Sequence, residues 1–167
     1  MKSTKWPSRY SLILVAFLLL VFLPAFPLSA ADSGVPKPTA RDKCPVCGMF
    51  VAKYPDFAAQ IQFRDGSTFH FDGAKDMFKY YLNLSRYAPG TKPADITAVF
   101  VTNYYDLTPV DGFQAHYVLG SDVYGPMGRE LIPFVKETEA HDFLKDHKGK
   151  TIIRFRDVTA AVLRSLD

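Results

Sequence analysis

The sequence predicts an α+β fold in which two small duplicated ββαβ units with antiparallel sheets follow a cleaved signal peptide. Short segments of alternating apolar residues occur in pairs, and each pair is followed by an amphipathic helical pattern and a further apolar strand. The order is the same in both halves of the chain, which favours an internal duplication. We assign the first unit to 44–103 and the second to 104–167.

The signal peptide is predicted over 1–30. Three basic residues precede an unbroken apolar run over 12–23, and small residues follow it as a cleavage site. The run is shorter than the roughly 20 residues that a membrane-spanning helix needs, so we expect cleavage rather than a retained anchor. Leu28-Ser29-Ala30 is followed by Ala31 and not by the cysteine that a bacterial lipoprotein acylates. We therefore expect a soluble periplasmic protein.

Composition excludes several classes of function. The chain has 20 Lys and Arg against 17 Asp and Glu, and three of the basic residues lie in the predicted signal, so the mature part is balanced in charge. A balanced chain without a basic stripe argues against nucleic acid as a partner. Since the sequence shows no Ser/His/Asp order, paired-carboxylate signature or phosphate-binding glycine loop, we expect a binding protein and not an enzyme. We also expect the protein to be monomeric.

The first unit should begin after a flexible lead-in at 31–43, which is polar and contains proline. Asp65-Gly66 favours the positive φ of a hairpin turn, and Asp72 is placed as the N-cap of the helix. The predicted elements are two strands, a helix and a third strand, at 57–63, 68–71, 74–84 and 97–102.

The second unit repeats this pattern and adds a terminal helix. Its first two strands are joined by a turn at Gly125-Pro126-Met127-Gly128, and its first helix is stopped by Gly149. The predicted elements are two strands, a helix, a strand and a short helix, at 113–119, 130–135, 137–147, 151–155 and 160–166.

The segment Cys44-Pro45-Val46-Cys47-Gly48-Met49 is the one that indicates chemistry, because it places two thiols and a thioether close together. Gly48 relieves backbone crowding, so that Cys47 and Met49 can face one pocket. Thiolate and thioether ligands select Cu(I). Zinc takes four ligands, and because the chain has no second Cys pair we expect zinc to bind more weakly. The candidate copper ligands here are Cys47, Met49 and Cys44.

Three alternatives stay open for this segment. Cys44 and Cys47 could be the redox pair of a periplasmic thiol–disulfide oxidoreductase, although such a pair usually follows a strand and opens a helix. The two cysteines could instead form an inert disulfide, and Met49 could be an ordinary packing residue.

Met127 is a further candidate ligand. A large apolar side chain between two glycines at a turn tip is poorly placed to pack in a core, and this turn could bring a second thioether to the first-unit motif. A packing role for Met127 is the alternative. Histidine can ligate copper. The four histidines lie in predicted strands or in a predicted helix, and we rank them below the sulfur residues as candidate ligands: His70, His116, His141 and His147.

Taken together, these segments resemble the NosL family of copper chaperones, which serve nitrous oxide reductase assembly. The shared pieces are Cys47-Gly48-Met49, Phe71-Asp72-Gly73-Ala74, Val101-Thr102 before Tyr104-Tyr105, and Gly120-Ser121-Asp122-Val123 leading to Gly125-Pro126-Met127-Gly128. The resemblance implies a duplicated ββαβ fold and one Cu(I) held by Cys47 and Met49, with Met127 also carried over. It implies delivery of the copper to apo nitrous oxide reductase or to its membrane maturation complex, an ABC transporter. Such proteins are commonly lipoproteins, whereas this sequence has Ala31 where the lipid-carrying cysteine would stand.

Overall fold

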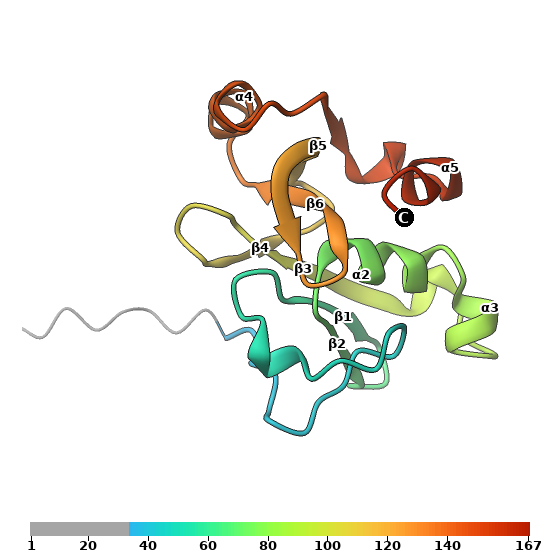
Figure 1. Cartoon of the computed structure of the whole chain (residues 1–167). Helices are drawn as coiled ribbons and strands as arrows, with labels where there is room; N and C mark the ends of the chain where they lie inside the picture. Colours follow the sequence, from blue (N-terminus) through green and yellow to red (C-terminus); the bar gives the residue numbers. More distant parts are fainter. Residues whose placement is uncertain (1–33) are drawn as a thin grey trace, which may run out of the picture. The chain divides into compact units, whose positions relative to one another are not determined.

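The structure is a computed structural model that describes residues 34–167 (Figure 1). The predicted signal peptide and Ala31 lie outside the described residues. Helices are labelled α, 3₁₀ helices η and strands β. In chain order the elements are η1 (Val51–Lys53), β1 (Ala59–Phe63), β2 (Thr68–Phe71), α2 (Ala74–Tyr81), α3 (Leu84–Tyr87), η2 (Pro93–Asp95), β3 (Ile96–Thr102), β4 (Pro109–Asp111), β5 (His116–Gly125), β6 (Gly128–Phe134), α4 (Glu137–Asp146), β7 (Thr151–Arg154), η3 (Phe155–Asp157) and α5 (Ala160–Arg164).

The strands form two antiparallel sheets, ordered β2-β1-β3-β4 and β6-β5-β7. In each sheet the first strand of a hairpin is central, the second strand of that hairpin lies on one side, and the strand after the helix lies on the other. Both halves of the chain thus share one ββαβ topology. The predicted α+β fold with two antiparallel sheets is confirmed. β4 extends the first sheet with a strand from 104–167, the segment that the sequence assigned to the second unit.

Most elements lie where the alternation of apolar residues predicted them, and the differences are at their ends. The Asp65-Gly66 turn is confirmed, with a φ of 87° at Gly66. β5 begins at His116 instead of residue 113. The reason is local: the carboxylate of Asp111 accepts a hydrogen bond from the backbone N–H of Phe113 at 2.9 Å, which favours a turn over an extended strand there.

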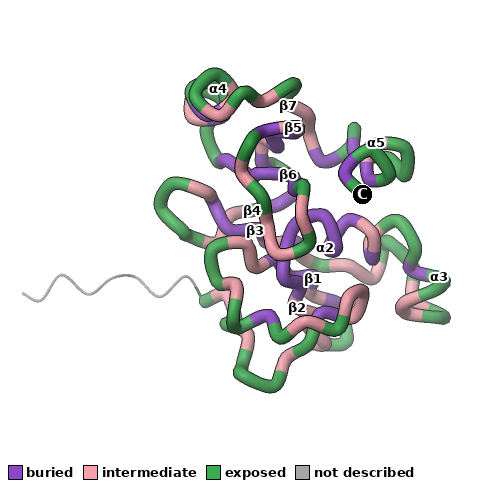
Figure 2. Tube along the Cα trace, in the orientation of Figure 1, coloured by how far each residue is buried: buried purple, intermediate pink, exposed green. Residues whose placement is uncertain are grey.

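Helix α2 is shared by the two halves of the chain. It contacts β1 and β2 of the first sheet, and also β6 and α5 of the second half. Residues 71–78 are therefore buried without interruption (Figure 2). Because both halves cover this helix, its charged residues are buried together with its apolar ones.

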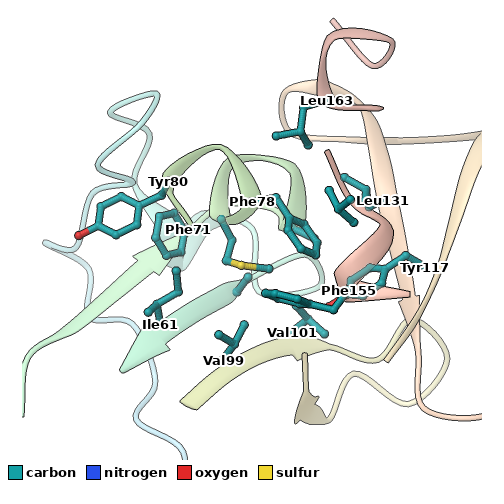
Figure 3. Packing of buried hydrophobic residues seen from close by; sticks show 14 of the residues in the cluster. Ile61, Phe71, Phe78, Tyr80, Val99, Val101, Tyr117, Leu131, Phe155 and Leu163 are labelled. Carbon is teal, nitrogen blue, oxygen red and sulfur yellow. The ribbon is translucent and has the colours of Figure 1, made fainter. Parts of the chain in front are cut away.

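The core around α2 is rich in aromatic rings (Figure 3). Met77 is fully buried in it, as the helical pattern of apolar residues predicted. The fully buried side chains of this cluster come from both halves and include Ile61, Phe71, Phe78, Tyr80, Tyr117 and Leu131. A second cluster lies between the other sheet and α4, and its buried members are Val118, Ile132, Phe134, Ala140 and Phe143. Among the described residues, no helix combines the length and the apolar character needed to cross a membrane.

Candidate metal centre

The segment Cys44–Met49 folds into a tight loop. The backbone N–H of Cys44 donates to the carbonyl of Met49 at 2.9 Å, and the N–H of Gly48 donates to the carbonyl of Cys44 at 2.9 Å. Lys43 and Phe50 close the loop as an antiparallel bridge. Gly48 has a φ of 81°, a conformation that side-chain-bearing residues rarely adopt. The glycine in the motif is thus explained by the turn.

Both thiols of the loop lie against two carboxylates near the start of α2. The ligand atoms of Cys44, Cys47, Asp72 and Asp76 all lie within 4.8 Å of one another; we call these four residues the Cys/Asp cluster. The Cys47 thiol donates to Asp72 Oδ1 at 3.2 Å, and the Cys44 thiol donates to Asp76 Oδ2 at 3.5 Å. Two sulfur and two oxygen donors from separate segments thus converge on one point, as metal ligands do.

Three of the four members of the cluster are buried. Cys44, Asp72 and Asp76 are at most 2% exposed, whereas Cys47 is partly exposed. Oδ2 of Asp72 is buried and has no hydrogen-bond partner within residues 34–167. A buried carboxylate oxygen without a partner is costly unless a cation or a donor satisfies it. The free side of Cys47 is therefore the natural route of an ion to this oxygen.

Burial also decides the protonation of the cluster. Burial raises the pKa of the Cys44 thiol to about 11 and raises the pKa of the Cys47 thiol as well. It raises the pKa of Asp76, with a smaller contribution from the negative charge of Asp72. Both thiols are free and protonated at neutral pH. Since a metal binds the thiolate, loading this site must release protons.

The prediction that Asp72 caps α2 is wrong. The N-cap residue is Gly73, and no side chain at the N-cap position accepts a hydrogen bond from the helix. Asp72 faces Cys47 instead, and Glu130 of β6 takes over the first turn: its Oε1 accepts a hydrogen bond from the backbone N–H of Lys75 at 2.5 Å. A Cβ on Gly73 would lie 2.2 Å from Oε2 of Glu130, so the absence of a side chain at Gly73 lets the glutamate approach.

Lys75 joins the helix to the hairpin of the second half. Its side chain is buried, and Nζ donates to the carbonyl of Met127 at 2.7 Å and to the carbonyl of Leu166 at 3.4 Å. Nζ also lies 3.5 Å from a carboxylate oxygen of Asp167. These contacts fix the Gly125–Gly128 turn beside the first turn of α2, which carries Asp76.

The predicted ligands come from two segments, the Cys44–Met49 loop and the Gly125–Gly128 turn, and both segments lie beside the start of α2. Cys44 and Cys47 lie in the cluster, and Met49 follows them in the same loop. Met127 is 43% exposed at the hairpin tip, so it is not a buried packing residue. Ligation by Met49 and Met127 stays a prediction. Within 34–167, no histidine belongs to the Cys/Asp cluster.

The NosL family model matches residues 35–163. The chain belongs to the NosL family. It is 26% identical over 125 residues to the copper-binding lipoprotein NosL of Stutzerimonas stutzeri, a match that covers 74% of this chain and 65% of that relative's length. The fold is similar to the crystal structure of the copper chaperone NosL from Shewanella denitrificans, with a TM-score of 0.64 and 21% identity over 78% of this chain and 98% of that one. The resemblance to NosL proteins is confirmed.

Proposed function

We propose that this NosL protein is a periplasmic metallochaperone that binds one Cu(I) at the Cys/Asp cluster and delivers it for nitrous oxide reductase maturation. The observation that carries the proposal is the convergence of two thiols and two carboxylates in a site whose partly exposed member is Cys47. The names of the two relatives, a copper-binding lipoprotein and a copper chaperone, support copper as the ion. The recipient is apo nitrous oxide reductase or its membrane maturation complex, an ABC transporter.

The thiols and carboxylates have different roles in this proposal. Thiolates are soft ligands that prefer Cu(I), whereas carboxylates prefer harder cations. Asp72 and Asp76 already accept the thiol hydrogen bonds; they orient both sulfur atoms, and they are the nearest acceptors for the protons that copper displaces. The soft ligands that complete the site are the thioethers of Met49 and Met127.

The carboxylates also correct one expectation about zinc. Weak zinc binding was expected because the chain has no second Cys pair and the sequence showed no evident fourth ligand. Two thiolates and two carboxylates are a four-ligand set that zinc accepts, so that reason no longer holds. Selectivity for copper must come from the softness of the thiolates and thioethers rather than from a missing ligand.

The metal-free protein should bind one Cu(I) per chain under anaerobic, reducing conditions. The measurement is a titration in competition with a chromophoric Cu(I) chelator, repeated with one equivalent of zinc present. We expect copper to displace the zinc, because the chain brings both thiols into a single cluster and soft ligands favour Cu(I). Retention of zinc in preference to Cu(I) would contradict the proposal.

A thiol–disulfide oxidoreductase using Cys44 and Cys47 is the second candidate function. A catalytic thiol of that class has a lowered pKa, which supplies the attacking thiolate. Here burial raises the pKa of both thiols, which argues against it. Reduction of insulin disulfides by the metal-free protein would reopen this alternative.

Met127→Ala should weaken Cu(I) binding by about tenfold, close to 1.4 kcal/mol, with the thermal midpoint unchanged. The side chain is exposed, so its removal takes little apolar area out of the core, while a third soft ligand is lost. Tyr124→Ala is the matched control, since Tyr124 is exposed on the same hairpin and has no sulfur. An unchanged affinity in Met127→Ala would remove Met127 from the site.

A further inference from the structure

A copper-receiving protein meets the Cys/Asp cluster at its partly exposed member, Cys47. Cys44, Asp72 and Asp76 are at most 2% exposed, and Cys47 is the partly exposed member. A ligand that takes over the copper must come within bonding distance of the ion while Cys47 still holds it. If the proposed function holds, the side chains beside the Cys44–Met49 loop must therefore touch the partner.

An exposed aromatic ring lies close to two ammonium groups at the base of this loop. Phe50 is 39% exposed, and its ring centroid lies 4.9 Å from Nζ of Lys43 and 5.6 Å from Nζ of Lys53. Both lysines are exposed. Because Lys43 and Phe50 are the backbone bridge that closes the loop, the ring is attached at the base of the loop that carries the thiols. We call Lys43, Phe50 and Lys53 the Lys–Phe patch.

The segment around the patch is basic, although the chain is not. Residues 34–167 contain 17 basic and 16 acidic residues. Over 34–56 the basic residues are Lys37, Arg41, Lys43 and Lys53, and the acidic ones are Asp42 and Asp56. Residues 57–167 contain 13 basic and 14 acidic residues. The positive excess is thus concentrated next to the loop that carries the thiols.

We infer that the Lys–Phe patch is the docking face for the copper-receiving protein, and that the matching face of that protein is acidic around an apolar contact. Opposite charges accelerate the encounter of two proteins. Carboxylates of the partner would draw the two ammonium groups from the ring, and the uncovered ring would be buried as a central aromatic anchor. The inference rests on the proposed function and adds the chemistry of its partner.

The test measures the rate of Cu(I) transfer from the loaded protein to apo nitrous oxide reductase. A second recipient is dithiothreitol, a small neutral thiol that needs no docking face. The variants are Lys53→Glu and Phe50→Ala. Lys43 is left unchanged because it directly precedes Cys44, so that its replacement could also alter copper binding. Lys145→Glu is the matched control, because Lys145 is also an exposed lysine but lies on α4.

We expect Lys53→Glu to slow transfer to the reductase by about tenfold at low ionic strength, and to lose this effect as salt is raised. Phe50→Ala should slow the same transfer at every salt concentration. Transfer to dithiothreitol and the Cu(I) affinity should not change, and Lys145→Glu should behave like the wild type.

Each other outcome overturns the inference in a recognisable way. If the wild type passes copper to the reductase and Lys53→Glu does so equally fast, the patch is not the docking face and the proposed function stands. If the loaded wild type gives no copper to the reductase alone, the same variants are measured with the membrane maturation complex as recipient, and equal transfer rates of wild type and Lys53→Glu there overturn the inference. If Lys53→Glu loses only a salt-sensitive binding to phosphatidylglycerol vesicles, the patch is a membrane contact.

Discussion

Replacing Cys47 with serine is expected to lower the Cu(I) affinity of this NosL protein at least about 100-fold, close to 3 kcal/mol of binding free energy. Cys47 is one of only two cysteines in the chain, and a hydroxyl is a poor ligand for a soft ion. The loop itself should persist, because its closing hydrogen bonds join backbone atoms of Cys44, Gly48 and Met49. The measurement is the competition titration described above.

Asp72→Asn gives the graded comparison for this experiment. Asparagine keeps the shape of the side chain and an oxygen that accepts the Cys47 hydrogen bond, but it has no negative charge. We expect a loss of about 10-fold or somewhat more, as for groups that orient metal ligands. A larger loss in Asp72→Asn than in Cys47→Ser would make Asp72 the principal ligand. A Cys47→Ser variant that binds Cu(I) like the wild type would exclude Cys47 from the site.

Cys44→Ser separates the resemblance from the geometry. The carry-over from the family places Cys47 and Met49 on the ion, which predicts that Cys44→Ser keeps substantial affinity. The structure places the Cys44 thiol in the same cluster as Cys47, which predicts a loss of similar size. The same titration on this variant decides whether both cysteines bind the copper or only Cys47 does.

The sequence predicted the elements of the fold well because each has a local pattern. The strand at 68–71 was predicted with the bounds of β2, and the helix at 137–147 is α4 extended by one residue. The duplication was visible because strand, strand, helix and strand recur in the same order. The ends of the elements were harder to predict. Near Phe113 the side chain of Asp111 accepts a hydrogen bond that favours a turn over an extended strand, and the alternation of apolar residues does not show this bond.

The carboxylates of the metal centre were missed for a different reason. Asp72 precedes a helix, and by the local rule an aspartate there is an N-cap. The first turn of the helix is hydrogen-bonded instead by Glu130, which accepts from the backbone N–H of Lys75, 55 residues away in the sequence. Asp72 is therefore free to face Cys47. A clue was present in the sequence: Asp72 and Asp76 have the spacing of one helical turn, and the apolar residues Phe71, Met77 and Phe78 adjoin them. Only the packing of α2 by both halves shows that this segment is buried.

Glu130 is a buried acidic residue of β6 that holds the two halves of the chain together. Its Oε1 accepts hydrogen bonds from the backbone N–H groups of Lys75 at 2.5 Å and Leu131 at 2.9 Å. Burial raises the pKa of Glu130 from 4.5 to about 8, although these two hydrogen bonds and the Lys75 charge oppose the shift. The folded protein therefore keeps a proton at neutral pH that the unfolded chain has lost.

The free energy of unfolding of the metal-free protein should consequently fall as the pH rises from about 5 to 8, by an amount on the order of 4 kcal/mol from Glu130. The contribution is complete below the unfolded pKa and is lost as the pH passes through the raised folded pKa.

Glu130→Gln should remove most of this dependence, because glutamine keeps an oxygen for both hydrogen bonds and has no proton to lose. Burial also raises the pKa of Asp76, which leaves a slope of the same sign, whereas burial lowers the pKa of His70 and of His116, which gives a slope of the opposite sign. Denaturant titrations from pH 5 to 8 measure the effect, with Glu137→Gln, an exposed residue of α4, as the control that should retain the wild-type slope. Equal slopes in Glu130→Gln and the wild type would show that Glu130 is ionised in the folded protein, held so by Lys75 and the two backbone N–H groups.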